Sequence, residues 1–168
     1  MIVAFTGHRP DKLGGYSSNP TQTAIKAEIR KLLNKLQPDK AISGMALGVD
    51  QWAAEICIRM KIPVIAAVPF AGQELKWPEE SQDRYNWLLS HCEEMVTVCD
   101  GGYAAWKMQK RNEWMVDHAD VVIAVWDGST GGTDNCVRYA RATKKKVHII
   151  DPDDFKPAPV MYERPGYL

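Results

Sequence analysis

The chain has 168 residues, of which 45% are hydrophobic and 25% charged, a composition typical of one globular domain. A chain of this length buries roughly 70% of its unfolded surface, so folding needs no disulfide or metal. Lys and Arg together number 21, as do Asp and Glu, and the formal net charge is zero. This balance argues against a broad basic surface for nucleic acid or anionic membranes, while a local basic pocket stays compatible with it.

The cysteine spacing and the N-terminus indicate the compartment. The cysteines form no Cys-x-x-Cys pair, which favours reduced thiols; they are Cys57, Cys92, Cys99 and Cys136. The opening MIVAFTG has no basic segment before it, and no run reaches the roughly 18 apolar residues of a membrane span. We therefore expect a cytoplasmic protein without a membrane partner.

Strand and helix patterns alternate along the chain. Strands are predicted at residues 2–6, 40–43, 63–69, 95–99, 119–126 and 146–150, and helices at 20 to about 36, 50–60, 78–92, 104–118 and 132–142. Strands separated by helices of this length predict an α/β fold, with a doubly wound, mainly parallel sheet covered by helices on both faces in a single domain.

The remaining residues, 151–168, are rich in proline, which argues against a further helix. We interpret 1–150 as the domain and 151–168 as a C-terminal tail. The tail is either laid over the surface, or a lid, or an arm exchanged in a dimer.

Three glycine turns follow predicted strands. In the first, Gly7, His8 and Arg9 come directly after a buried strand, and a turn requires neither charge. This predicts a ligand-facing loop, which continues to Tyr16.

The second turn contains Ser43, Gly44 and Gly48 and leads to Asp50 at a helix start. Its two glycines suit close backbone approach to a phosphate, but they equally suit tight packing between strand and helix.

In the third turn, Gly131, Gly132 and Thr133 open a helix whose N-terminus can bind an anion, with Thr133 or Ser129 as a capping residue. Carboxyl ends of parallel strands meet at one sheet edge, where ligands bind. The three turns together predict an anion site there.

Arg111 lies on the predicted helix 104–118, which precedes the strand 119–126, and its guanidinium can form two parallel hydrogen bonds to a phosphate. The predicted ligand is a nucleotide, with Tyr16 or Trp77 as candidates for stacking on its base. The chain has no G-x-x-x-x-G-K-[ST], G-x-G-x-x-G or G-x-S-x-G motif, and its histidines are scattered. We predict no metal and no cofactor.

Several of these residues carry a family resemblance. The spacing of Met108, Arg111, Met115, Ala119 and Asp120 matches the motif M-H-x-R-K-x-x-M-x-x-x-[SA]-D, with Gln109 for His and Asn112 for Lys. With the opening T-G-H-R-P and the run S-G-M-A-L-G-V-D, they resemble the SLOG superfamily, which includes lonely-guy phosphoribohydrolases and DNA-processing protein A. The likeness is greatest to a GHRP-type, DUF1273-like branch of bacteria and phages.

The resemblance implies a Rossmann-like fold over residues 1–150, a homodimer or higher homo-oligomer, and a substrate-binding, catalytic role for Arg111. The family's catalytic glutamate, the last residue of P-G-G-x-G-T-x-x-E, falls on Cys136. Asp50, Glu55, Asp127 and Asp134 are the candidates for a relocated catalytic carboxylate. Asp50 is the first choice, and it is also a candidate acceptor for a ribose hydroxyl.

Three functions follow as hypotheses. The first is binding of a nucleotide or nucleotide-derived molecule for sensing or sequestration, which needs only the glycine turns and Arg111. The second is hydrolysis of a nucleotide's N-glycosidic bond by the relocated carboxylate. The third is binding of single-stranded nucleic acid, which the neutral net charge disfavours.

Overall fold

The computed structural model describes residues 1–156, and the part of the predicted tail beyond Lys156 lies outside the described residues. Six parallel strands form one sheet in the order β4-β3-β2-β1-β5-β6. The strands are β1 (Ile2–Gly7), β2 (Lys40–Ser43), β3 (Val64–Val68), β4 (Glu94–Thr97), β5 (Val121–Val125) and β6 (Lys146–Ile150). The helices are α1 (Pro20–Leu36), α2 (Val49–Arg59), α3 (Glu79–Ser90), α4 (Ala105–Asp117) and α5 (Gly132–Ala142). The predicted fold class and order of elements are confirmed.

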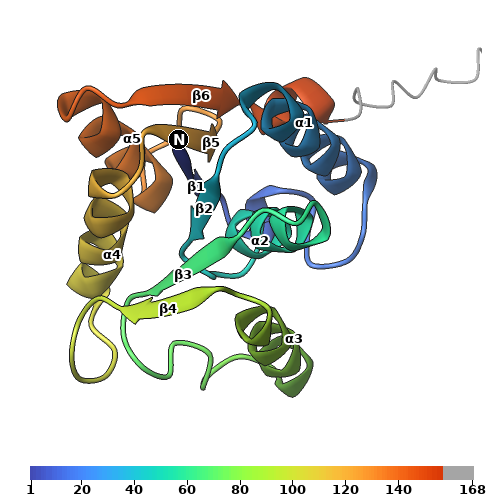
Figure 1. The fold of residues 1–168 in the computed structure, drawn as a ribbon. Coiled ribbons are helices and arrows are strands. Elements are labelled where there is room, and N and C mark those ends of the chain that lie inside the picture. Colours follow the sequence, from blue (N-terminus) through green and yellow to red (C-terminus); the bar gives the residue numbers. More distant parts are fainter. Residues whose placement is uncertain (157–168) are drawn as a thin grey trace, which may run out of the picture.

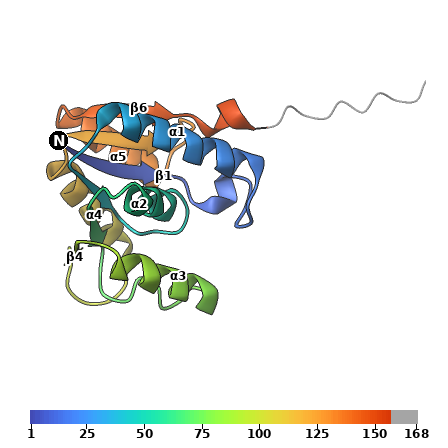
Figure 2. The ribbon, with the colours of Figure 1, turned by 45° about the vertical axis from the view of Figure 1, so that its right-hand side comes forward.

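Helices cover both faces of the sheet. Figure 1 shows α1, α2 and α3 on one face and α4 and α5 on the other, and the turned view of Figure 2 agrees. From β1 to β4 the chain winds in one direction; it then returns through α4 to β5, on the other side of β1. Right-handed crossovers place helices on opposite faces when the winding direction reverses.

The central strands are buried on both sides, which explains their continuous apolar sequence. Val3 and Phe5 belong to the core under α1 and α2, whereas Ala4 between them packs with Met115 of α4. Among the described residues, no helix has the length and apolarity to cross a bilayer.

The start of the predicted tail differs from expectation. A short 3₁₀ helix, η2 (Pro152–Phe155), follows β6 and begins at a proline, where the missing N–H costs no helical hydrogen bond. The Asp151 side chain accepts a hydrogen bond from the Asp153 N–H at 2.9 Å, and Thr21 Oγ1 of α1 donates to the Phe155 carbonyl at 3.4 Å. The proline-rich composition thus excluded an α-helix here but not this single turn.

The winding direction reverses between β1 and β5, which are neighbours in the sheet. Their carboxyl ends lead into residues 8–12, which include the 3₁₀ helix η1 (Pro10–Lys12), and into residues 126–131. Loops that diverge from adjacent strands leave a crevice between them, and this is the usual ligand position in such sheets.

Candidate functional site

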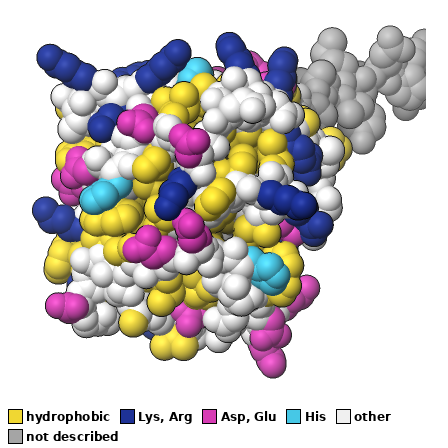
Figure 3. Space-filling model, viewed as in Figure 1, with side chains coloured by type: hydrophobic (Ala, Val, Ile, Leu, Met, Phe, Trp, Pro, Cys, Tyr) yellow, Lys and Arg dark blue, Asp and Glu magenta, His cyan; other side chains and the backbone are white. Residues whose placement is uncertain are grey.

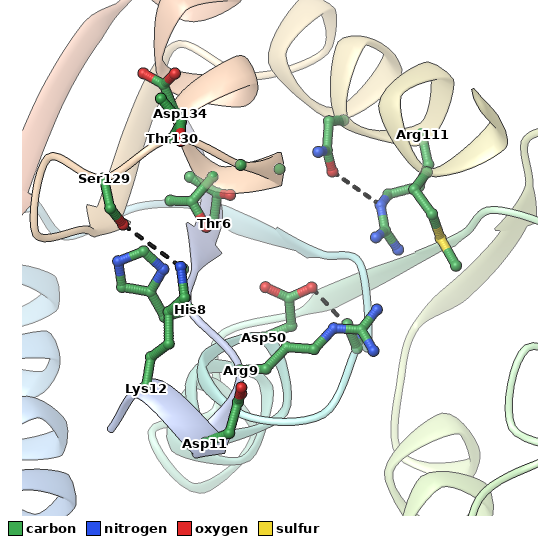
Figure 4. A pocket seen from close by; sticks show the side chains of 17 residues that line it. Thr6, His8, Arg9, Asp11, Lys12, Asp50, Arg111, Ser129, Thr130 and Asp134 are labelled. Carbon is green, nitrogen blue, oxygen red and sulfur yellow. Dashed lines mark hydrogen bonds between the residues drawn. The ribbon is translucent and has the colours of Figure 1, made fainter. Parts of the chain in front are cut away.

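A cleft of about 270 Å³, which we call the first cleft, opens where β1 and β5 end (Figure 4). Residues after β1, before α2, around the start of α5 and on one side of α4 form its walls. The lining residues are Thr6, Gly7, His8, Arg9, Asp11, Lys12, Ala46, Asp50, Met108, Arg111, Asn112, Ser129, Thr130, Gly131, Gly132, Thr133 and Asp134.

The N-terminus of α5 meets the first cleft without a capping side chain. Gly131 is the N-cap residue, with φ at 146°, and no side chain within residues 1–156 accepts a hydrogen bond from the first turn. A Cβ at Gly131 or Gly132 would meet no other heavy atom within 4 Å. Since the first N–H groups of a helix have no intrahelical partner, this end presents donors and positive dipole charge to open space. Such an arrangement binds anions.

The glycines of the other two turns have packing reasons. A Cβ at Gly44 would lie 2.6 Å from Arg111 Nη1, and one at Gly48 would lie 2.9 Å from the His8 backbone oxygen. At Gly7, a Cβ would come within 2.7 Å of the side chain that begins α2. The structure therefore supports, for the second turn, the packing alternative left open by the sequence.

Arg111 connects α4 to the ends of two strands. Its side chain is 5% exposed, and its Nη1 donates to the carbonyl oxygens of Gly44 at 2.6 Å and Ala67 at 3.4 Å. Nε donates to Asn112 Oδ1 at 3.0 Å. Burial lowers the pKa of Arg111, although an arginine keeps its charge under ordinary conditions. Arg111 thus brings a cation to the cleft wall while also holding the fold together there.

Asp50, in the first turn of α2, points its carboxyl group into the first cleft (Figure 4). The residue is 7% exposed, and its Oδ2 accepts a hydrogen bond from the Ala46 N–H at 3.3 Å. Burial raises the pKa of Asp50, while the nearby Arg111 charge opposes that rise. A buried carboxyl group in this position can accept a hydrogen bond from a ligand hydroxyl or move a proton.

His8 and Asp127 join the loops that follow β1 and β5. His8 Nε2 lies 2.9 Å from Asp127 Oδ1, and the Ser129 hydroxyl and N–H donate to the same oxygen at 2.5 and 2.9 Å. The Ser129 hydrogen bonds, followed by the His8 contact, hold the pKa of Asp127 well below its usual range. His8 and Ser129 line the first cleft but Asp127 does not. Asp127 therefore positions other side chains. The prediction that Thr133 or Ser129 caps α5 is wrong, because the N-cap residue is Gly131.

Most of the predicted site residues line the first cleft, and the others do not. Those that line the first cleft are Gly7, His8, Arg9, Asp50, Arg111, Asn112, Gly131, Gly132 and Thr133. Those outside the lining are Tyr16, Ser43, Gly44, Gly48 and Asp127. Tyr16 is 68% exposed, and Ser43 is fully buried, with its hydroxyl donating to the Asp50 carbonyl at 2.7 Å.

Other lining residues were absent from the predicted set, notably Lys12, whose Nζ lies 3.5 Å from Ser129 Oγ and so bridges two loops. The rest are Thr6, Asp11, Ala46, Met108 and Thr130, whereas Ser129 and Asp134, which also line the cleft, were predicted as a helix cap and a candidate carboxylate. Each lies within a few residues of a predicted one, so proximity along the chain was the available signal.

Cys136, at the position of the family's catalytic glutamate, lies behind the cleft wall. It is 1% exposed and packs with Val116, Val122 and Ala140. Burial raises the pKa of its thiol to about 11, so the group is neutral at physiological pH. Asp134, two residues earlier on α5, lines the cleft instead.

Charges of both signs surround the first cleft, with Arg9, Lys12 and Arg111 as cations and Asp11, Asp50 and Asp134 as acidic groups. On the face shown in Figure 3, Lys and Arg lie along the upper edge and across the middle, where Asp and Glu lie among them, and the lower part carries mainly Asp and Glu. The site is thus a local cluster of charges of both signs that suits a small polar ligand.

Curated relatives include a UPF0398 protein of Bacillus pumilus (strain SAFR-032), which is 30% identical over 112 residues. That match covers 61% of this chain and 60% of the relative. A UPF0398 protein of Bacillus thuringiensis (strain Al Hakam) is 29% identical over the same shares. The match thus spans about 60% of the length of these relatives.

Among solved structures, DNA processing protein A of Streptococcus pneumoniae superposes with a TM-score of 0.67 at 18% identity, over 95% of this chain and 51% of that chain. The Helicobacter pylori protein of the same name, which binds single-stranded DNA, superposes with a TM-score of 0.64 at 18% identity, over 89% of this chain and 64% of that chain. At these identities the likeness concerns the fold. The family model YpsA, described as the YspA SLOG family, matches residues 3–155. The chain therefore belongs to the YpsA SLOG family.

Proposed function

We propose that this protein binds a nucleotide or nucleotide-derived small molecule, with a phosphate group at the N-terminus of α5. The observation that carries the proposal is the uncapped start of that helix, where Gly131 and Gly132 border open cleft rather than protein atoms. A phosphate there accepts hydrogen bonds from backbone N–H groups that have no partner within the helix.

The surrounding side chains complement such a ligand. Lys12 and Arg9, which both line the first cleft, add positive charge opposite the helix start. Asp50 faces the same space and can accept a hydrogen bond from a ribose hydroxyl. The cleft offers hydrogen-bond donors for a phosphate and a hydrogen-bond acceptor for a hydroxyl group. This combination fits a ribose phosphate better than a simple inorganic anion.

Hydrolysis of the N-glycosidic bond is the second candidate, and Asp50 is the observation that favours it. This carboxyl group is buried, faces the cleft and has a raised pKa, which suits a group that gives or takes a proton during the reaction. Cys136 cannot take that role, because it is a neutral, buried thiol outside the lining.

The first experiment incubates the purified protein with mononucleotides, dinucleotides and ADP-ribose derivatives, and follows depletion and free base by liquid chromatography and mass spectrometry. A nucleotide depleted and then recovered intact after denaturation supports binding without turnover. Release of free base that Asp50→Asn abolishes, while binding persists, supports hydrolysis. If no compound is depleted and no free base is released, both candidates are contradicted.

Lys12→Gln tests the position of the site, with Lys31→Gln as the matched control. Both lysines are exposed, both changes remove one positive charge, and Lys31 lies on α1 outside the first cleft. We expect weaker nucleotide binding only in Lys12→Gln. Equal affinity in the two variants argues against the first cleft. Binding of a single-stranded oligonucleotide alone, with affinity falling steeply as salt rises, would instead favour the nucleic-acid hypothesis.

A further inference from the structure

A second cleft, of about 440 Å³, adjoins the first. Its walls come from residues 70–77, in the loop after β3, and from residues 102–105, at the start of α4. Arg9 and Met108 line both clefts, so the two spaces share a wall. A ligand that spans both clefts would therefore pass Arg9 and Met108.

The two clefts differ in chemistry. The second is bordered by the aromatic residues Phe70, Trp77 and Tyr103. Phe70 is 4% exposed and forms part of the wall, whereas Tyr103 is 69% exposed at the rim. The two rings meet edge to face, with centroids 5.9 Å apart. Aromatic side chains placed in this way offer surfaces on which a nucleobase stacks.

The rim that carries Tyr103 is held in place within the protein. Lys107 is 7% exposed, and its Nζ donates to the carbonyl oxygens of Asp100 and, at 2.7 Å, Gly102. The same Nζ lies 6.0 Å from the centre of the Phe70 ring. Because these contacts fix the loop, a ligand loses little affinity in ordering it.

Size favours one ligand across both spaces. The first cleft, at about 270 Å³, falls below the roughly 300–1,000 Å³ of typical small-molecule sites, and it is lined mainly by polar and charged residues. The second cleft is larger and has aromatic walls, which the polar first cleft lacks. A nucleotide has the same two parts, an anionic sugar phosphate and a planar base.

We propose that the second cleft holds the base of a free nucleotide whose phosphate lies at the start of α5, with Tyr103 and Phe70 beside the base. This assignment rests on the nucleotide binding proposed above. It makes Tyr103 a binding residue for the base alone, and Arg9 the residue beside the middle of the ligand.

The test compares wild type with Tyr103→Ala, Tyr103→Phe and the control Trp87→Ala, whose aromatic ring is 43% exposed on α3 and lines neither cleft. Calorimetric titrations use AMP, ADP-ribose and ribose 5-phosphate, which lacks a base. We expect Tyr103→Ala to bind AMP and ADP-ribose about 5- to 150-fold more weakly, the range for loss of one stacked base. Ribose 5-phosphate affinity stays unchanged, Tyr103→Phe restores nucleotide binding, and Trp87→Ala behaves as wild type.

Equal AMP and ADP-ribose affinity in Tyr103→Ala and wild type would overturn the base assignment. So would an equal weakening of ribose 5-phosphate, since that probe has no ring to stack. Failure of the underlying nucleotide-binding proposal has a different signature: wild type binds none of the probes, or Lys12→Gln binds them as wild type does. If only a single-stranded oligonucleotide binds and responds to Tyr103→Ala, the cleft belongs to a strand and the free-nucleotide assignment is wrong.

Discussion

Two alanine substitutions in predicted site glycines separate ligand binding from folding. At Gly132, the first residue of α5 and part of the lining of the first cleft, an added Cβ meets no atom within 4 Å. At Gly48, φ is 97° and the Cβ lies 2.9 Å from the His8 backbone oxygen and 2.9 Å from Pro10 Cδ. The same chemical change is therefore expected to have opposite effects at the two positions.

Gly132→Ala is expected to keep or raise stability, by up to about 1 kcal/mol, because alanine loses less conformational freedom in a helix. Its methyl group occupies space proposed for the phosphate. Loss of one hydrogen bond to a charged group weakens nucleotide binding by about 1.5–3 kcal/mol, or roughly 10- to 100-fold.

Gly48→Ala is expected to destabilise the protein. With φ at 97° and ψ at −131°, the backbone of Gly48 has a conformation that costs a non-glycine residue about 1–3 kcal/mol, and overpacking adds about 1–3 kcal/mol. A combined loss of about 2–6 kcal/mol lowers the melting temperature by roughly 4–24 °C for a chain of this size.

Thermal unfolding by circular dichroism and titration with AMP or ADP-ribose measure both effects on the same samples. The reasoning is refuted if Gly132→Ala melts several degrees below wild type, because its Cβ would then meet protein. It is equally refuted if Gly132→Ala binds nucleotide as wild type does, or if Gly48→Ala is as stable as wild type.

Other predictions concern the groups around the site. The pKa of Asp127 is lowered in the folded protein. Its ionised form therefore stabilises the fold at pH values above 3.8, the usual pKa of this group, and the stabilisation is lost as the pH falls below that value. Asp127→Asn should lower the free energy of unfolding at pH 7 and show a smaller deficit near pH 3, measured by urea unfolding; a deficit that does not change with pH contradicts this. Arg111→Lys, which cannot reproduce the hydrogen bonds of the guanidinium, should lose about 1–3 kcal/mol of stability in the same assay, and a wild-type midpoint would argue against a structural role. Cys57 and Cys136 are buried, with pKa values raised to about 12 and about 11, so iodoacetamide at pH 8 should label them only after unfolding; labelling of the folded protein, seen by peptide mass spectrometry, would contradict their burial.

The order of elements was predictable because its signals are local. Asn19 and Pro20 mark the start of α1, and the Asn19 side chain indeed accepts a hydrogen bond from the Gln22 N–H at 2.9 Å. The apolar run 2–6 identified β1, a strand buried on both faces. Alternation of such strands with long helices then leaves a parallel, doubly wound sheet as the simplest arrangement, and this sheet brings the strand-end turns to one edge.

The sequence by itself determined which turns meet at the edge of the sheet, but only the tertiary structure decided the role of each glycine in those turns. Position 44 requires glycine because Arg111, 67 residues later, packs on it. Position 48 requires glycine because the backbone at His8 lies against it. Gly131 and Gly132 have the same residue type and face open space. A glycine's role depends on what occupies the volume where its Cβ would lie, and those atoms come from distant parts of the chain. For the same reason the aromatic second cleft, whose two walls are separate loops, appears only once the chain has folded.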